Sequence, residues 1–315
     1  MKIVTLAEIK AIIERADPTL LLQSMEDAFI AYSNGTATIP PVGHLGFKKP
    51  PGDMHIKYGH ISNDPNFVIK VATGFYDNQS IGLPNNSGLM LVMDAKTGQP
   101  RVLLQDDGYL TDLRTAIAGA VVAQHTAPTQ VKAIGIIGTG VQARLQLKCL
   151  KWVTDCRKVY VFGRNKDKVT AYAAEMSVDG FEITVCDTPG EVANACNLIV
   201  TTTASKIPLL EADDIHPSTH ITAMGSDVPG KQELEAGILA KADVVLCDSQ
   251  TQCVDHGETY FAVGNGLLHH EEIVEVGTWI EAGFHRSDDA ISVADLTGIA
   301  TQDIKIASFV LDALG

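Results

Sequence analysis

A short glycine-rich stretch constrains the fold of this chain more than any other feature of its sequence. Gly138, Gly140 and Ala143 directly follow an apolar run that ends at Ile137. This spacing, between a predicted strand and a predicted helix, is typical of dinucleotide-binding folds. The first glycine permits a tight turn, the second lets the backbone approach a pyrophosphate, and the alanine allows the helix to pack on the sheet. The helix N-terminus offers unpaired N–H groups and a partial positive charge to phosphates.

The second half of the chain alternates between apolar runs and helix-like segments, which favours this interpretation over an isolated turn. Alternation of this kind predicts βαβ units and a parallel sheet. The predicted strands are residues 131–137, 158–162, 182–186, 198–202, 220–224 and 243–247, and the predicted helices include 141–152, 166–176 and 232–241. We therefore expect an α/β fold with a Rossmann dinucleotide-binding domain over residues 125–295.

The first 124 residues follow a different pattern and predict a second domain. Short alternating segments predict strands at 55–58, 68–73, 88–94 and 101–105, with a loop over 48–53 and a hairpin turn at 94–98. Apolar periodicity predicts helices at 6–15, 18–34 and 111–124. The last segment, residues 298–314, is apolar on one face, so we expect a helix that packs back on the first domain.

Charge and cysteine content narrow the class of protein. The 24 basic and 38 acidic residues give a net charge of −14, which disfavours nucleic acid or anionic membranes as partners and suits small molecules. None of the six cysteines forms a C-x-x-C pair, so we expect reduced core thiols in a reducing compartment. No signal or transit peptide and no membrane span is expected, which favours a cytoplasmic location.

The end of the second predicted Rossmann strand bears on which dinucleotide is bound. NAD-binding folds place an Asp or Glu there to contact the ribose hydroxyls, whereas this chain has Gly163, Arg164, Asn165 and Lys166. Gly163 leaves room, and Arg164 and Lys166 carry the charge to pair with a 2′-phosphate. We therefore expect NADPH, with NADH possible. The alternative for Arg164 is that it stacks on the adenine.

Three segments together resemble the ornithine cyclodeaminase/mu-crystallin family. They are Leu110–Ala116 (LTDLRTA), Gly138–Ala143 (GTGVQA) and Gly225–Leu234 (GSDVPGKQEL). Further matches follow in the same order along essentially the whole chain, at residues 68–71, 82–84, 94–100, 201–203, 248–249 and 257–258.

The resemblance implies a particular architecture and chemistry. Residues 1–124, closed by residues 296–315, would form a mixed α/β substrate and dimerisation domain, beside the Rossmann domain of residues 125–295. The subunit would form a homodimer. The shared chemistry of the family is hydride transfer between a nicotinamide and the α-carbon of an amino or imino acid.

The resemblance also assigns roles to three charged residues. Arg114 and Lys70 would hold the substrate carboxylate, Arg114 through bidentate pairing, and orient the α-carbon towards the nicotinamide. Asp227 would act as the catalytic carboxylate that supplies a proton at the imine nitrogen, directly or through water. The alternatives are a helix-surface arginine at 114, an ordinary strand lysine at 70, and an Asp227 that only caps a following helix.

Residues of the matching loops are the candidate cofactor contacts: Thr115, Gly138, Thr139, Gly140, Val141, Gln142, Arg164, Asn165, Lys166, Thr202, Thr203, Gly225 and Ser226. One departure concerns the substrate. Family members often have an arginine in the early strand region and a Met-Pro pair before the lysine segment, and this chain has neither in residues 40–44 or 54–58. His44 or Lys57 would replace that arginine, and Lys57 would share a pocket with Lys70 if their strands pair.

The expected function is an NAD(P)H-dependent imine reductase, most like the members that reduce Δ1-pyrroline-2-carboxylate to L-proline. Three alternatives remain open: an NAD-dependent ornithine cyclodeaminase, a simple amino-acid dehydrogenase, and a non-catalytic NADP(H)-dependent binding protein of the crystallin type. We expect no metal site, because the adjacent residues of His269–Glu272 do not share a face of a helix.

Overall fold

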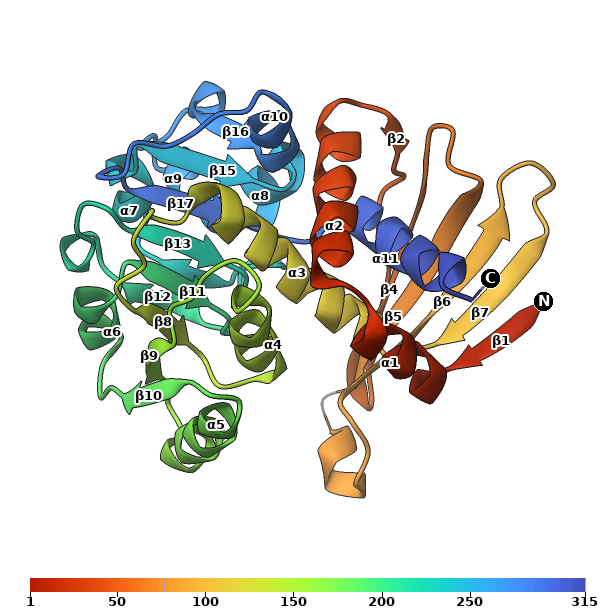
Figure 1. The fold of residues 1–315 in the computed structure, drawn as a ribbon, viewed down its shortest axis with the longest axis horizontal. Helices are drawn as coiled ribbons and strands as arrows, with labels where there is room; N and C mark the ends of the chain where they lie inside the picture. The colour runs from red at the N-terminus through yellow and green to blue at the C-terminus, as the bar shows by residue number, and fades with distance from the viewer. Residues whose placement is uncertain (76, 315) are drawn as a thin grey trace. The chain divides into compact units, whose positions relative to one another are not determined.

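The computed structural model describes residues 1–75 and 77–314, which separate into two compact units (Figure 1). The first unit comprises Met1–Arg114 and Ile299–Gly315, and the second comprises Thr115–Gly298. The first division falls within helix α3 (Tyr109–Thr126), whereas the sequence placed a domain boundary at the end of that helix.

The first unit is built on a mostly antiparallel sheet of order β1-β7-β6-β5-β4-β2. Strand β3 pairs with residues 51–56 of β4, along the edge of β4 that does not pair with β5. Only β1 and β7 run parallel. The strands are β1 (Lys2–Thr5), β2 (Ala37–Thr38), β3 (Gly43–Lys48), β4 (Pro51–Ile61), β5 (Asn66–Phe75), β6 (Asn86–Asp94) and β7 (Pro100–Gln105). The prediction of a loop over residues 48–53 is therefore wrong except at residues 49 and 50. Strands β3 and β4 form a tight hairpin in which Lys48 pairs with Pro51.

Helices α1 (Leu6–Arg15), α2 (Pro18–Ser33) and α11 (Ala300–Asp312) complete the first unit, with the short 3-10 helix η1 (Asn78–Ile81). Thr5 begins α1 with a capping box, and Asp17 caps α2, which has Pro18 in its first turn. Helix α11 lies against α2 and against β4 and β5 (Figure 1). The C-terminal segment therefore covers the same sheet that begins the chain.

The two faces of this sheet differ in burial. On the helix-covered face, cross-strand neighbours such as Val4, Leu104 and Met90 are fully buried. The opposite face carries a row of cross-strand neighbours in Ile3, Leu103, Leu91, Ile69 and Tyr58. These side chains are half-buried or exposed, with Ile3 at 52% and Tyr58 at 39%. An apolar row that stays partly exposed across five strands is a feature of a surface that binds a partner.

The second unit has an entirely parallel eight-stranded sheet of order β10-β9-β8-β11-β13-β17-β15-β16. Its strands are β8 (Ile134–Ile137), β9 (Lys158–Phe162), β10 (Glu182–Val185), β11 (Leu198–Thr201), β13 (His220–Ala223), β15 (Val244–Cys247), β16 (Ile273–Glu275) and β17 (Ser292–Asp295). Strands β12 (Lys206–Leu210) and β14 (Gln232–Leu234) form a separate pair. Strands β9 and β10 extend the sheet on one side of β8, and β11 and β13 extend it on the other side. Strand order therefore reverses between β8 and β11, and such sheets bind ligands at this switch point.

The helices of the second unit follow its strands: α4 (Val141–Leu150), α5 (Lys166–Val178), α6 (Pro189–Ala195), α7 (Ala236–Lys241), α8 (Gln250–His256), α9 (Glu258–Gly264) and α10 (Val276–Glu281), with 3-10 helices η2 (Ala212–Asp214) and η3 (His270–Glu272). A buried apolar cluster lies on each face of the sheet. Residues 134 and 136 of β8 pack into one cluster and residue 137 into the other. Burial on both faces explains why these strands read as continuous apolar runs.

Some sequence predictions for this unit differ from the structure. The helix predicted over residues 232–241 begins only at Ala236, because Gln232–Leu234 pair with β12. Strands β12, β14, β16 and β17 were not predicted, although β17 lies between β13 and β15 in the sheet. Across the described part of the chain, no helix is long and apolar enough to cross a membrane.

Candidate functional site

The glycine loop lies at the carboxyl end of β8, where it joins α4. Gly138 has a φ of +121°, and a Cβ on it would lie 2.5 Å from Oγ1 of Thr202, so only glycine fits. A Cβ on Gly140 would meet nothing within 4 Å. Gly140 is the N-cap residue of α4 and makes no side-chain cap hydrogen bond, and a helix N-terminus attracts an anion through its backbone N–H groups and its dipole. The loop therefore fits the pyrophosphate of a dinucleotide.

Arg144, which was not predicted from the sequence, fixes the backbone of this loop. Its guanidinium donates to the carbonyl oxygens of Thr139 and Gly140, the latter at 3.1 Å, and pairs with Glu175 at 2.6 Å. The side chains of Val141 and Gln142 occupy the first turn of α4, and Val141 is exposed. A side chain of α4 therefore fixes the conformation of the loop that precedes this helix.

The residues after β9 form the second part of the dinucleotide half of the site. A Cβ on Gly163 would lie 2.9 Å from side-chain carbons of both Thr139 and Val169, so this glycine is required by packing against the glycine loop. Arg164 and Lys166 are exposed. Asn165 caps α5 by accepting a hydrogen bond from the backbone N–H of Lys168 at 2.9 Å. Arg164 and Lys166 are therefore two exposed cations directly after β9, followed by Asp167 in the first turn of α5.

The loops after β11 and β13 are tied together by a buried carboxylate. Glu233 accepts hydrogen bonds from the hydroxyl of Thr201 at 2.7 Å, from the backbone N–H of Thr203, and from that of Gly225 at 2.8 Å. Thr202 donates its backbone N–H to Ile137 at 2.9 Å, which joins this loop to β8. The glycine loop and the two following loops therefore lie along one edge of the sheet.

A second buried carboxylate, Glu258, holds the residue beside the candidate catalytic Asp227. It accepts hydrogen bonds from the hydroxyl of Ser226 and from the backbone N–H groups of Glu233 and Leu234, at 2.7 and 3.0 Å. Burial, and the nearby carboxyl of Asp295, raise the pKa of Glu258 to about 8. Glu258 therefore fixes the position of this loop rather than carrying an ordinary surface charge.

Asp227 itself is half exposed and pairs with Lys231, whose Nζ lies 2.6 Å from its Oδ1. The suggestion that Asp227 only caps a helix is wrong, because the chain continues from it through a turn into β14. Its side chain instead stays accessible at the carboxyl edge of the sheet, which suits a group that exchanges protons with a ligand.

The first unit holds a buried cluster of three charges. Nζ of Lys70 lies 2.8 Å from Oδ2 of Asp303, and Nε of Arg114 lies 3.0 Å from Oδ1 of the same carboxylate. Arg114 also donates to the side-chain oxygen of Gln302 at 2.8 Å. All three charged side chains are at most 6% exposed. Arg114 is therefore not a surface arginine, and Lys70 is a buried lysine that is paired with a carboxylate.

The electrostatics of this cluster follow from its burial. Burial lowers the pKa of Lys70 to about 7, with Arg114 and Lys57 adding to the effect and Asp303 opposing it. Burial also favours the neutral form of Asp303, but Lys70 and Arg114 outweigh it and hold the pKa of this carboxyl below its usual range. One carboxylate is shared by two basic groups, so the cluster has positive charge left to attract an anion while Lys70 is protonated.

The register of the sheet places the other predicted substrate residues. Lys57 of β4 lies directly opposite Lys70 of β5, so the two share one face. His44 lies opposite His55, with ring centroids 4.9 Å apart, and two residues along β4 from Lys57. Thr115 begins the second unit, where its carbonyl oxygen accepts from Gln146 at 3.1 Å. The structure therefore groups the substrate candidates on one sheet face of the first unit.

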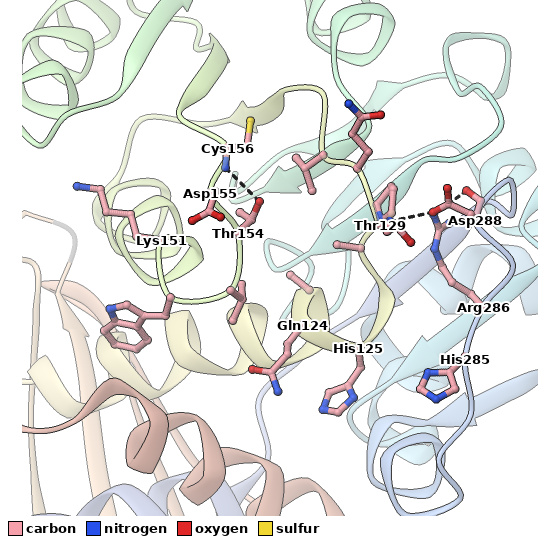
Figure 2. A pocket seen from close by; sticks show the side chains of 17 residues that line it. Gln124, His125, Thr129, Lys151, Thr154, Asp155, Cys156, His285, Arg286 and Asp288 are labelled. Atoms are coloured by element: carbon pink, nitrogen blue, oxygen red, sulfur yellow. Dashed lines mark hydrogen bonds between the residues drawn. The ribbon is translucent and has the colours of Figure 1, made fainter.

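One cavity in the second unit lies away from all of these residues. It has a volume of about 880 Å³ and is lined by the end of α3 and the segments that precede β8, β9 and β17 (Figure 2). Figure 2 shows His125, His285 and Arg286 in its wall, and the bond from Thr129 to Asp288. Parallel sheets bind nucleotides at the carboxyl ends of their strands. This cavity is at the amino ends and is therefore not the dinucleotide site.

Besides Arg144, three residues of the site escaped the sequence analysis as functional candidates. Asp303 was seen only as part of an amphipathic helix, because nothing in its neighbourhood indicates a buried charge. Glu233 and Glu258 lay within matched segments, but burial and partners are visible only in the structure. Within the described residues, no group of three His, Cys, Asp or Glu side chains could hold a metal ion.

Comparison with known sequences identifies relatives over nearly the whole length of the chain. The sequence profile of the ornithine cyclodeaminase/mu-crystallin family matches residues 4–315. An uncharacterized cyclodeaminase, y4tK, of Sinorhizobium fredii is 37% identical over 98% of this chain and 94% of its own length. The alanine dehydrogenase of Archaeoglobus fulgidus is 33% identical over the same shares of the two chains.

Solved structures with the same fold include proteins with bound nicotinamide dinucleotides. An archaeal alanine dehydrogenase dimer with bound NAD has a TM-score of 0.89 and 30% identity, covering 99% of this chain and 95% of the other. The Δ1-pyrroline-2-carboxylate reductase of Thermococcus litoralis, in complex with NADH and L-proline, has a TM-score of 0.89 and 25% identity, over 99% and 97%. The predicted fold class, a Rossmann domain with a mixed α/β domain, is confirmed.

Proposed function

Because the chain belongs to the ornithine cyclodeaminase/mu-crystallin family, we propose that it is an NAD(P)H-dependent reductase of α-imino acids. The reference substrate is Δ1-pyrroline-2-carboxylate, whose reduction gives L-proline. The observation that carries the proposal is the buried Lys70–Asp303–Arg114 cluster, in which two cations share one carboxylate. Such a cluster retains the positive charge that a substrate carboxylate requires.

Different residues of this chain have different roles in the proposed imine reduction. Arg114 and Lys70 hold the substrate carboxylate and fix the direction of its α-carbon. A bound reduced nicotinamide supplies the hydride that is added to this carbon. Asp227 supplies the proton that the imine nitrogen gains, directly or through water, so that the C=N bond becomes CH–NH. Glu258 and Glu233 keep the loop of Asp227 in place through their bonds to Ser226 and Gly225.

NADPH is proposed as the preferred cofactor. The position after β9 has no acidic residue to contact ribose hydroxyls, and it exposes Arg164 and Lys166 to a 2′-phosphate. The similar solved structures hold NAD or NADH, so both reduced cofactors belong in any assay.

A homodimer is proposed as the assembly. The row of Ile3, Leu103, Leu91, Ile69 and Tyr58 offers a continuous apolar surface to a second copy of the same sheet face. A related structure is described as a dimer, and burial of such a face supports stable association.

A panel of assays that follows NADPH and NADH oxidation tests the proposed function. The substrates are Δ1-pyrroline-2-carboxylate, Δ1-piperideine-2-carboxylate, and pyruvate with ammonia or methylamine; L-ornithine with NAD tests the cyclodeaminase alternative. We expect oxidation with the cyclic imines, faster with NADPH. Ammonia release from ornithine without net NADH formation would overturn the reductase proposal, and dinucleotide binding without turnover of any substrate would favour a binding protein.

A further inference from the structure

The cavity at the amino ends of β8, β9 and β17 lies wholly within the second unit, on the edge of the sheet opposite to the glycine loop. Its volume of about 880 Å³ is that of a site for a small organic molecule. None of its lining residues belongs to the site described above. A ligand in this cavity would therefore take no part in hydride transfer.

Two carboxylates line the cavity from different loops. Asp155 lies in the loop before β9, is exposed, and among the described residues has no hydrogen bond or ion pair. Asp288 lies in the loop before β17, where its Oδ1 accepts from the backbone N–H of Thr129 at 2.8 Å. This bond directs the carboxylate without cancelling its charge, because the donor is neutral. Figure 2 shows Asp155 and Asp288 on separate sides of the pocket.

The two strongly basic side chains of the wall are engaged with other groups. Lys151 donates to a backbone carbonyl oxygen outside the cavity, and its Nζ lies 4.6 Å from the centre of the Phe181 ring, so its charge is directed away from the cavity (Figure 2). The guanidinium of Arg286 donates to the backbone carbonyl oxygens of Ala290 and Asp288, the latter at 3.1 Å. Neither base therefore neutralises Asp155 or Asp288 by a direct ion pair.

Carboxylates outnumber the guanidinium around Arg286. Burial lowers the pKa of Arg286, and Asp288, Asp243 and Asp289 oppose this effect through their charges. Asp243 and Asp289 are themselves bonded to neutral donors, a backbone N–H and a hydroxyl. Three acids beside one base leave this side of the cavity with a surplus of negative charge, so the cavity attracts a cation at both of its acidic positions.

Much of the remaining wall is apolar or aromatic. The indole of Trp152, three residues before Asp155, lines the cavity, and among the described residues its ring has no aromatic or cationic partner. Tryptophan is the aromatic side chain that best attracts an organic cation. The apolar part of the wall consists of Ala123, Ala127, Pro128, Val131 and Val153. Two acids in an apolar wall match a molecule with cationic ends and a hydrocarbon chain.

We propose that this cavity binds an aliphatic diamine. One ammonium group pairs with Asp155 and lies against the ring of Trp152, the other pairs with Asp288, and the methylene chain covers the apolar wall. The site is separate from the dinucleotide and substrate residues, and it does not rest on the proposed function.

The competing explanation is general attraction of cations to an acidic chain, whose net charge is −14. General attraction depends on the total charge, so removal of any one exposed acid has the same small effect. A built site requires Asp155 and Asp288 in particular, and it favours a ligand with two ammonium groups over a ligand with one.

Calorimetric titration of the full chain with cadaverine and with pentylamine separates the two explanations. The two amines have the same number of carbons, and at about pH 8 both are protonated whereas histidine is neutral. We expect cadaverine to bind about tenfold more tightly, because its second ammonium group gains a charge pair. Asp155→Asn and Asp288→Asn should each bring this ratio close to one. Asp213→Asn, at an exposed acid of η2, should leave it unchanged.

Tryptophan fluorescence locates the bound amine. The chain has two tryptophans, and Trp279 is buried in α10. In a Trp279→Phe protein the emission comes from Trp152 alone. Cadaverine should change this emission over the same concentrations at which it releases or absorbs heat, and the addition of Asp155→Asn should abolish the change at those concentrations.

Equal affinities for cadaverine and pentylamine in the unaltered chain would overturn the proposal. So would a tenfold ratio that survives either Asp155→Asn or Asp288→Asn, because binding would then depend on general charge. Cadaverine binding without a change in the emission of Trp152 would place the amine outside this cavity and would overturn the proposal as well. The outcome of the imine assays alters none of these measurements.

Discussion

The ammonium group of Lys70 lies 2.8 Å from the carboxylate of Asp303, although the two residues lie far apart in the sequence. Asp303 lies in α11 and Lys70 in the middle strand β5 of the sheet beneath it. The pair therefore fastens the C-terminal helix to this sheet. The same carboxylate also lies 3.0 Å from Nε of Arg114, so one acidic residue connects α11 with both β5 and α3.

Replacing this carboxylate by Asp303→Asn is expected to destabilise the protein by about 3 to 5 kcal/mol, because two buried cations lose their only shared charge partner. Urea unfolding followed by circular dichroism measures the change. Asp312→Asn, at the exposed end of the same helix, serves as the control and is expected to change stability by less than about 0.5 kcal/mol. Similar midpoints for both variants would show that the buried pair contributes little.

Much of this arrangement could be read from the sequence, and the limits have physical causes. The glycine loop and the parallel strands were predictable because a strand buried on both faces is a continuous apolar run and the loop needs glycine. The family prediction from three motifs is confirmed by the match over residues 4–315. Asp303 was not predictable, because a buried acid in a helix looks like an exposed one until its partners from distant strands are known.

Strand β17 shows a second limit. Its four residues are fully buried between β13 and β15, yet two of them, Ser292 and Asp295, are polar. Asp295 is tolerated there because it accepts bonds from the backbone N–H and the hydroxyl of Thr259, at 2.9 and 3.0 Å. A strand whose polar groups are satisfied by tertiary contacts carries no apolar pattern for a sequence to reveal.

Asp227→Asn is expected to lower kcat by about 10² to 10⁴-fold, because the amide cannot supply a proton to the imine nitrogen. The dissociation constant for NADPH, measured by fluorescence titration, should stay the same, since the glycine loop is untouched. Asp213→Asn, an exposed acid in η2, is the matched control. Turnover by Asp227→Asn equal to that of the unaltered chain would remove Asp227 from its assigned role.

Arg164→Gln is expected to raise KM for NADPH about tenfold and to leave KM for NADH nearly unchanged, because only NADPH has a 2′-phosphate for the guanidinium to pair with. Lys168→Gln removes a charge from the exposed surface of α5 nearby and should affect neither value. Equal increases for both cofactors would instead support stacking of Arg164 on the adenine.

The buried carboxyls Glu258 and Asp295 make stability depend on pH. Burial raises their folded-state pKa values to about 8 and about 7, above those of the unfolded chain. The folded protein therefore holds more protons than the unfolded chain between about pH 5 and pH 8, and the free energy of unfolding falls as pH rises through this window. Urea unfolding at successive pH values measures the slope, which Glu258→Gln should reduce because one titrating group is lost. A stability that rises steadily over this range would contradict the assignment.

The apolar row on the open sheet face leads to the prediction about assembly. Leu91 lies at the centre of this row, between Leu103 and Ile69. Leu91→Lys places a charge where a second copy would bury it, so light scattering on a sizing column should show the mass of a dimer for the unaltered chain and of a monomer for the variant. The side chain is only half-buried within one subunit, so the variant is expected to keep its fold. Leu267→Lys, at a site 49% exposed in the second unit, should remain dimeric. A dimer that persists in Leu91→Lys would place the interface on another surface of the subunit.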